Sequence, residues 1–158
     1  MKLSDFYKLA AAIIVSEMAG IIGSAFTFPA IGSWYAGLVR PRIAPPNWLF
    51  GPVWTALFLL MGIAAFLVWR KGLGNKEVRS ALFLFGVQLV LNALWSFIFF
   101  GAHSLGGAFI ELVVLWIAIA ATMAAFSRVS KAATWLMVPY ILWVTFAGFL
   151  NFLFWVLN

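Results

Sequence analysis

Five long apolar stretches, separated by short polar or basic segments, constrain the fold of this chain more than any other feature. A helix needs roughly 20 apolar residues to cross the hydrocarbon core of a bilayer, and each stretch reaches about that length. Lipid offers no partners for unpaired backbone groups, and the stretches lack the alternation typical of membrane β-strands. We therefore predict an all-α membrane protein, a bundle of five transmembrane helices with spans near 9–28, 48–69, 81–100, 105–126 and 132–156.

The composition excludes a water-soluble globule. Of the 158 residues, 66% are hydrophobic and 9% are charged, whereas soluble domains are about half apolar and about a quarter charged. A second core does not fit beside five spans, so residues 1–158 are expected to form one domain. The chain has no cysteine, which excludes disulfides and thiolate metal sites. Its one histidine, His103, has no companion ligands nearby, and we expect neither a metal nor a cofactor.

The basic residues indicate membrane orientation rather than nucleic-acid binding. Ten basic and four acidic residues give a net charge of +6, but the basic ones lie in clusters between the apolar stretches. Arg40 and Arg42 lie on one side of the predicted membrane, and eight lie on the other: Lys2, Lys8, Arg70, Lys71, Lys76, Arg79, Arg128 and Lys131. The positive-inside rule then places the N-terminus in the cytoplasm and the C-terminus outside. We expect an integral, multi-pass protein of a bacterial cell membrane.

The first outer connection, 29–47 (PAIGSWYAGLVRPRIAPPN), is much longer than the predicted loops at 72–80 and 127–131. Its prolines fix φ and favour extended geometry, and its aromatic residues argue against disorder. We expect a stiff loop that packs over the mouth of the bundle as a lid. The alternative is a loop that is docked among lipid headgroups.

A helical rise of ~1.5 Å per residue gives each side chain a depth below the outer surface. Polar and aromatic residues of four spans converge on the outer half of the membrane or reach its middle: Trp54, Asn92, Trp95, Glu111, Trp143 and Asn151. Helical spacing also gives two stripes that mix amide and indole groups, one of Gln88, Asn92 and Trp95 and the other of Trp143, Ala147 and Asn151. Because amides avoid lipid, both stripes are expected to face inward. There they would either contact a bound ligand or hold the helices together by interhelical hydrogen bonds.

The nine tryptophans divide by position. Four lie near span ends and are interpreted as interfacial anchors: Trp48, Trp69, Trp135 and Trp155. Trp116 is interpreted as facing lipid. Trp54, Trp95 and Trp143, with Trp34 above them, are predicted to line a cavity for a planar, apolar ring system. Pro139 is expected to kink the fifth helix below Trp143. Arg40 and Arg42 would meet carboxylates of the ligand or lipid headgroups.

Three segments resemble one known family. They are WYAGLVRPRIAPPNWLFGPVWTALFLLMGIA at 34–64, LNALWS at 91–96 and VPYILWVTFAGFLNF at 138–152. They are similar to the tryptophan-rich sensory protein or translocator protein family, also called peripheral benzodiazepine receptors. The resemblance implies a five-helix membrane protein, often a homodimer, that binds porphyrins such as protoporphyrin IX and isoquinoline or benzodiazepine drugs, and in mitochondria cholesterol.

The resemblance also implies roles for particular residues. Trp54 and Trp143 match the two tryptophans that are implicated in binding porphyrin and, in some bacterial members, in the light-driven breakdown of the porphyrin. The lid tryptophan is Trp34, the asparagine of L-N-x-x-W is Asn92, and Ala147 is the small residue of the drug and sterol region. Sterol binding is doubtful, because the family's sterol motif needs a tyrosine followed by a basic residue near the C-terminus, and this chain has neither there.

The leading functional hypothesis is a tetrapyrrole-binding protein with a sensory or regulatory role. Two alternatives use the same cavity: light- and oxygen-dependent degradation of the porphyrin, and transport of porphyrin, lipid or sterol. Small residues on the third span, including Gly86 and Ala93, together with the resemblance, predict a homodimer.

Overall fold

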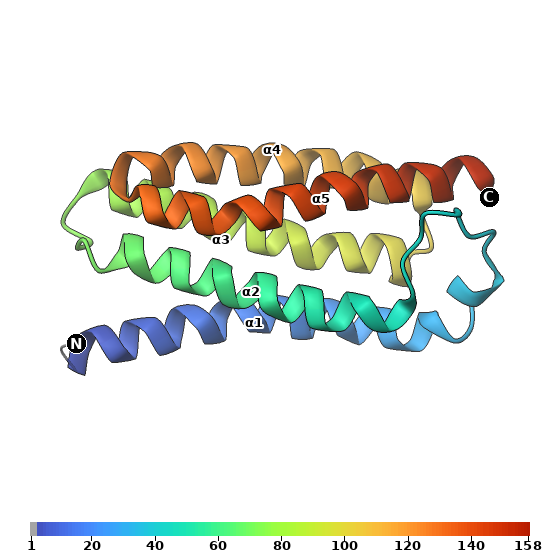
Figure 1. Ribbon diagram of the computed structural model, residues 1–158, viewed down its shortest axis with the longest axis horizontal. Helices are drawn as coiled ribbons and strands as arrows, with labels where there is room; N and C mark the ends of the chain where they lie inside the picture. The colour runs from blue at the N-terminus through green and yellow to red at the C-terminus, as the bar shows by residue number, and fades with distance from the viewer. Residues whose placement is uncertain (1–2) are drawn as a thin grey trace.

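The computed structural model describes residues 3–158, which form five long helices joined by one long first loop and shorter connections (Figure 1). They are α1 (Leu3–Ile31), α2 (Asn47–Trp69), α3 (Lys76–Ser96), α4 (Leu105–Val129) and α5 (Lys131–Leu157). The one-turn 3-10 helix η1 (Tyr35–Gly37) lies in the first loop, and the π-helical segment η2 (Phe97–Gly101) continues α3. All five long helices have the length and hydropathy to cross a membrane, and residues 3–158 contain no strand. The predicted all-α fold is confirmed.

Successive helices run in opposite directions, so the two ends of the chain lie at opposite ends of the bundle (Figure 1). Around the bundle the helices follow the order α1, α2, α5, α4, α3, and α3 closes the ring against α1. The helices α3 and α5 are therefore not neighbours and face each other across the interior. The loop 32–46 lies at the same end as the C-terminus, which we call the loop end (Figure 1).

The helices extend beyond the predicted spans. The helix α1 begins at Leu3 and continues through Pro29, so that the first connection begins only after Ile31. Much of the predicted loop 72–80 belongs to α3, and the predicted loop 127–131 shrinks to Ser130 alone. Side-chain caps explain these last two differences. The side-chain oxygen of Asn75 accepts a hydrogen bond from the Glu77 N–H (2.8 Å), and the Ser130 hydroxyl accepts one from the Ala133 N–H (3.3 Å).

The basic clusters predicted for one side of the membrane all lie at the end of the bundle opposite the loop end, except that Lys2 is outside the described residues. Arg40 and Arg42 lie in the loop 32–46. The helix α5 continues through Pro139 without interruption, and the kink expected there stays a prediction.

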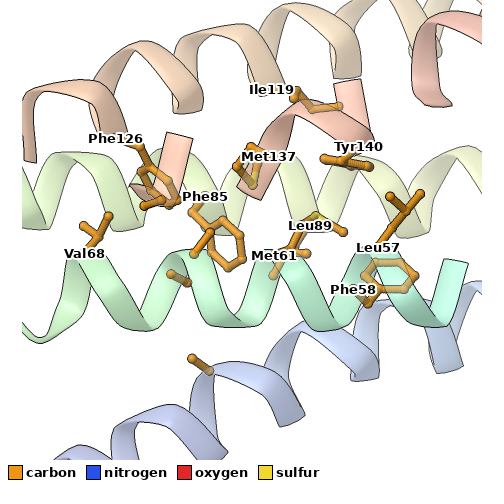
Figure 2. Close-up of a cluster of buried hydrophobic side chains, with 14 of the residues drawn as sticks. Leu57, Phe58, Met61, Val68, Phe85, Leu89, Ile119, Phe126, Met137 and Tyr140 are labelled. Atoms are coloured by element: carbon orange, nitrogen blue, oxygen red, sulfur yellow. The ribbon is translucent and has the colours of Figure 1, made fainter. Parts of the chain in front are cut away.

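The hydrophobic core is formed mainly by α2, α3, α4 and α5 (Figure 2). Figure 2 labels ten of its side chains, all from these four helices: Leu57, Phe58, Met61, Val68, Phe85, Leu89, Ile119, Phe126, Met137 and Tyr140. The helix α1 contributes only Ala12 and Ala19 to the buried cluster. It approaches α2 closely, because a Cβ atom added at Gly62 would lie 2.6 Å from the Cα of Ile13. Small residues thus bring two membrane helices into backbone contact.

Candidate ligand site

A small cavity lies inside the bundle. Its walls come from four helices and include four of the eight predicted ligand residues: Trp54, Asn92, Trp95 and Ala147. Leu112 and Leu115 of α4 and Val144 of α5 complete the lining. The cavity has a volume of about 10 Å³, which is close to the space of a single water molecule.

A polar bridge crosses the interior beside this cavity. The hydroxyl of Tyr140, on α5, donates a hydrogen bond to the side-chain oxygen of Gln88 (2.8 Å) and accepts one from the Asn92 amide (2.9 Å), both on α3. The Gln88 amide points to the sulfur of Met61 on α2, at 3.8 Å. Because α3 and α5 are not neighbours in the ring, this bridge ties together opposite sides of the bundle. Tyr140 and Gln88 are completely buried.

A second bridge lies nearer the loop end. The indole N–H of Trp95 donates to the side-chain oxygen of Asn151 (3.1 Å), and the Asn151 amide donates to the backbone carbonyl of Leu105 at the start of α4 (2.8 Å). Asn92 and Asn151 thus both make interhelical hydrogen bonds, as the non-ligand alternative predicted. Asn92 does more, because it also lines the cavity, and its side-chain oxygen accepts no hydrogen bond from the rest of residues 3–158.

Trp143 and Trp34 lie outside the cavity lining. The ring of Trp143 packs against Phe50 of α2 (5.9 Å between centroids) and Phe146 (5.5 Å), and its buried N–H has no hydrogen-bond partner within residues 3–158. The ring of Trp34 stacks on His103 (4.3 Å, 9° between planes) and meets the edge of Phe99. Their roles as ligand contacts stay predictions.

Sequence reasoning missed Tyr140 and Val144. On α5 the spacing of Trp143, Ala147 and Asn151 suggested one stripe, but each step of four residues advances about 40° beyond a full turn. The inward stripe is instead Tyr140, Val144, Ala147 and Asn151, because steps of four and three residues alternate and cancel the drift. Trp143 lies about 60° around the helix from Tyr140. The same spacing rule therefore finds the correct face when it starts from Tyr140.

Glu111 is buried on α4, 8% exposed, and neither carboxyl oxygen has a hydrogen-bond partner within residues 3–158. It belongs to the inward face of α4 together with Leu112 and Leu115. An ionisable residue inside a membrane span is a candidate functional group by default. Among the acidic residues, it is the one that the fold places inside the bundle.

The loop 32–46 is tied to the bundle through its aromatic and polar groups. Tyr35 is buried, with its ring 5.4 Å from that of Phe154 on α5 and 5.6 Å from that of Phe100 on η2. The backbone N–H of Val39 donates to the side-chain oxygen of Asn158 (2.8 Å), and the Asn158 amide donates back to the Val39 carbonyl (3.2 Å). These contacts hold the loop against the end of the chain.

Arg40 makes its contacts within the loop and with the first residue of α2. Its guanidinium donates to the Pro45 carbonyl (2.8 Å) and to the Asn47 side chain (2.9 Å), and it lies 5.8 Å from the centre of the Tyr35 ring. Arg42 is exposed. The predicted contacts of these arginines with ligand carboxylates or headgroups stay predictions, although Arg40 also has a structural role.

The pKa of Tyr35 provides a first test of the docked loop. Burial raises this pKa above its ordinary value, and the nearby Arg40 charge offsets only part of the rise. The stabilisation of the docked loop by neutral Tyr35 is therefore complete below the undocked pKa of about 10 and is lost as the pH rises through the higher, docked value. We expect the difference in tyrosinate absorbance between wild type and Tyr35→Phe to have its midpoint above pH ~10. A midpoint at or below that value would show that Tyr35 is not buried in solution.

Five apolar spans and an interior lined with amides and aromatic rings define a multi-pass integral membrane protein, in which buried polar groups of α3 and α5 form bridges from the middle of the bundle toward the loop end. The chain belongs to the TspO/MBR family, whose model matches residues 12–156. It is 48% identical over 145 residues to the tryptophan-rich protein TspO of Chlorobaculum tepidum. The aligned region covers 91% of each chain. It is 40% identical to the protein of that name from Archaeoglobus fulgidus, over 98% of this chain and 99% of the relative. The human translocator protein is 41% identical, over 90% of this chain and 85% of the relative.

Proposed function

We propose that this protein binds a flat tetrapyrrole of the protoporphyrin IX type inside the bundle and has a sensory or regulatory role in the membrane. The observation that carries the proposal is the cavity lined by Trp54, Trp95 and Asn92. Two indoles offer faces and edges to a planar ring, and the free oxygen of Asn92 can accept a hydrogen bond from the ligand. The printed names of relatives, tryptophan-rich protein and tryptophan-rich sensory protein, support a sensory role.

The cavity must open before such a ligand can enter. Sites for drug-sized ligands usually have volumes of about 300–1,000 Å³, far above the cavity's volume of about 10 Å³. The walls that can move are side chains, chiefly Leu112 and Leu115, and the bridge between Asn92 and Tyr140. Binding therefore includes an opening cost, which lowers the apparent affinity and slows association.

Quenching of tryptophan fluorescence by protoporphyrin IX tests the proposed function. We expect saturable quenching of the wild type, and an increase in Kd of about fivefold or more for Trp54→Ala, since a lost aromatic wall is worth roughly 1 kcal/mol beyond its buried area. Trp48→Ala is the matched control, because Trp48 lies on the same helix but is 71% exposed. Absence of saturable quenching in the wild type would contradict the function. Equal effects of the two variants would contradict the site.

We also propose a homodimer that forms through the outer face of α3. Gly86 and Ala93 are half-buried on that face, Val90 between them is 69% exposed, and a Cβ added at Gly86 would meet nothing within 4 Å. The face thus has small residues that leave room for close approach by a second copy. The mass of the protein in detergent tests this proposal. We expect the mass of a dimer for the wild type and of a monomer for Gly86→Leu, and a wild-type monomer would contradict the proposal.

A further inference from the structure

A groove runs between α4 and α5 on the outside of the bundle, about 260 Å³ in volume. Phe109, Val113 and Trp116 line it from α4, and Thr145, Gly148 and Phe149 line it from α5. Val113, Trp116 and Phe149 are 44%, 40% and 56% exposed, so the groove opens outward. In a membrane-spanning bundle, this opening faces the lipid acyl chains.

The groove and the interior cavity share two side chains. Leu112 of α4 and Val144 of α5 are the residues that line both spaces. Both are buried, 4% and 1% exposed. These two aliphatic side chains therefore form a thin wall between the lipid and the cavity, and they carry no polar group that would have to break a hydrogen bond to move.

Gly148 lies directly beside this wall. It is buried opposite Leu112, and a Cβ atom added there would lie 3.1 Å from the Leu112 Cδ2 atom. The missing side chain leaves room for the groove, and the Leu112 side chain fills the space beside it. Movement of Leu112 and Val144 would join the groove to the cavity, which brings the combined space close to the ~300 Å³ lower limit of ordinary ligand sites.

The groove has defined ends. Toward the loop end lies a cluster of aromatic rings, in which Phe109 is 5.5 Å from Phe152 and 6.1 Å from Trp155 between centroids. At the other end the Trp116 indole donates a hydrogen bond to the Thr145 hydroxyl (2.9 Å), which ties α4 to α5. The positions 109 to 116 span about 10 Å of helix. The groove is thus an aromatic-rimmed slot at the depth of the cavity.

The loop end offers a more strongly closed route. The loop 32–46 is fixed there by buried Tyr35, by the pair of hydrogen bonds between Val39 and Asn158, and by the Arg40 contacts. A ligand that came from water would have to break these polar contacts. A ligand dissolved in the bilayer would reach the cavity by displacing Leu112 and Val144, which are aliphatic and make no side-chain hydrogen bond.

We propose that the groove between α4 and α5 is a lateral portal, through which a flat apolar ligand passes from the bilayer into the cavity between Leu112 and Val144. The portal rests on the proposed function, because it serves the same cavity. Its ligand class is an apolar or amphipathic planar molecule that partitions into lipid, with protoporphyrin IX as the probe. The aromatic rim and Trp116 would contact the ring system before it enters.

The absence of native cysteine allows a direct test. Phe109→Cys with Phe152→Cys places two thiols at the rim of the portal, and Val39→Cys with Asn158→Cys places two at the loop contact. Each pair is joined with a short bifunctional methanethiosulfonate reagent in protein reconstituted in lipid vesicles. Stopped-flow quenching by protoporphyrin IX is then measured before joining, after joining and after reduction.

Joining the portal pair is expected to slow association at least about tenfold and to leave Kd nearly unchanged, because a blocked route slows entrance and exit together. Joining the loop pair is expected to leave the rate unchanged. Reduction of the portal pair should restore it. If the loop pair slows association and the portal pair does not, the portal is overturned.

A point variant gives an independent measure. Val144→Ala thins the wall and should speed association several-fold, whereas Val156→Ala, on the exposed end of α5, should not. Equal rates in these two variants would contradict the portal. Absence of quenching in the unjoined protein would instead contradict the proposed function, and the portal with it.

Discussion

Replacement of Ala147 by phenylalanine will raise the Kd for protoporphyrin IX at least about 100-fold, which corresponds to roughly 2.7 kcal/mol. Ala147 lines the cavity from α5, beside Val144 and across from Trp54 and Trp95. A phenyl ring there occupies the volume into which the opened cavity must admit the ligand. Tight interiors resist added volume, so the new ring competes directly with the macrocycle.

The measurement is a quenching titration on Ala147→Phe and on Ala121→Phe, which adds the same ring to an exposed position of α4. Thermal unfolding of both variants in detergent is measured beside it. A folded Ala147→Phe protein that binds within about threefold of wild type, a difference of less than about 0.7 kcal/mol, would show that the ligand does not occupy this cavity.

Gly62→Ala will destabilise the bundle by about 1–3 kcal/mol, although it adds a single carbon. The added Cβ would lie 2.6 Å from the Cα of Ile13 and 3.1 Å from the carbonyl oxygen of Ala12. Both neighbours are backbone atoms of α1, so no side chain can turn aside, and the whole helix must move away from α2. Because α1 contributes few large side chains to the core, close backbone contact is its main attachment.

Thermal unfolding of Gly62→Ala in detergent should therefore begin at a lower temperature than that of wild type. Gly51→Ala is the matched control, since it lies on the same helix and its added Cβ would meet nothing within 4 Å. There the substitution is expected to be neutral or slightly stabilising, because alanine favours helix. If both variants unfold alike, the close approach of α1 and α2 is absent in solution.

The five spans could be predicted from the sequence because the bilayer imposes one length and one backbone conformation on any segment that crosses it. The ends of the helices were harder to predict from the sequence. Asn75 and Ser130 cap helices that the hydropathy of their neighbours did not reveal, and α1 passes through Pro29, which was expected to begin a loop.

The inward face of α3 followed from its sequence, because Gln88, Asn92 and Trp95 carry groups that lipid cannot satisfy. The predicted inward face of α5 differed from the observed one, because the helical spacing was counted from Trp143 instead of Tyr140. The small volume of the cavity could not be predicted from the sequence. It depends on how the side chains of Leu112, Leu115 and Val144 fill the space between helices, and helical periodicity does not tell which helices lie in contact.

A structure of the protein with bound protoporphyrin IX in lipid tests the central claim most directly. We predict a macrocycle between α2, α3, α4 and α5 that contacts Trp54, Trp95 and Ala147, with Leu112 displaced from its position in the closed cavity. A macrocycle found only on the outer surface of the bundle or on the loop 32–46, with the cavity still closed and the Tyr140 bridge to Asn92 intact, would contradict the account.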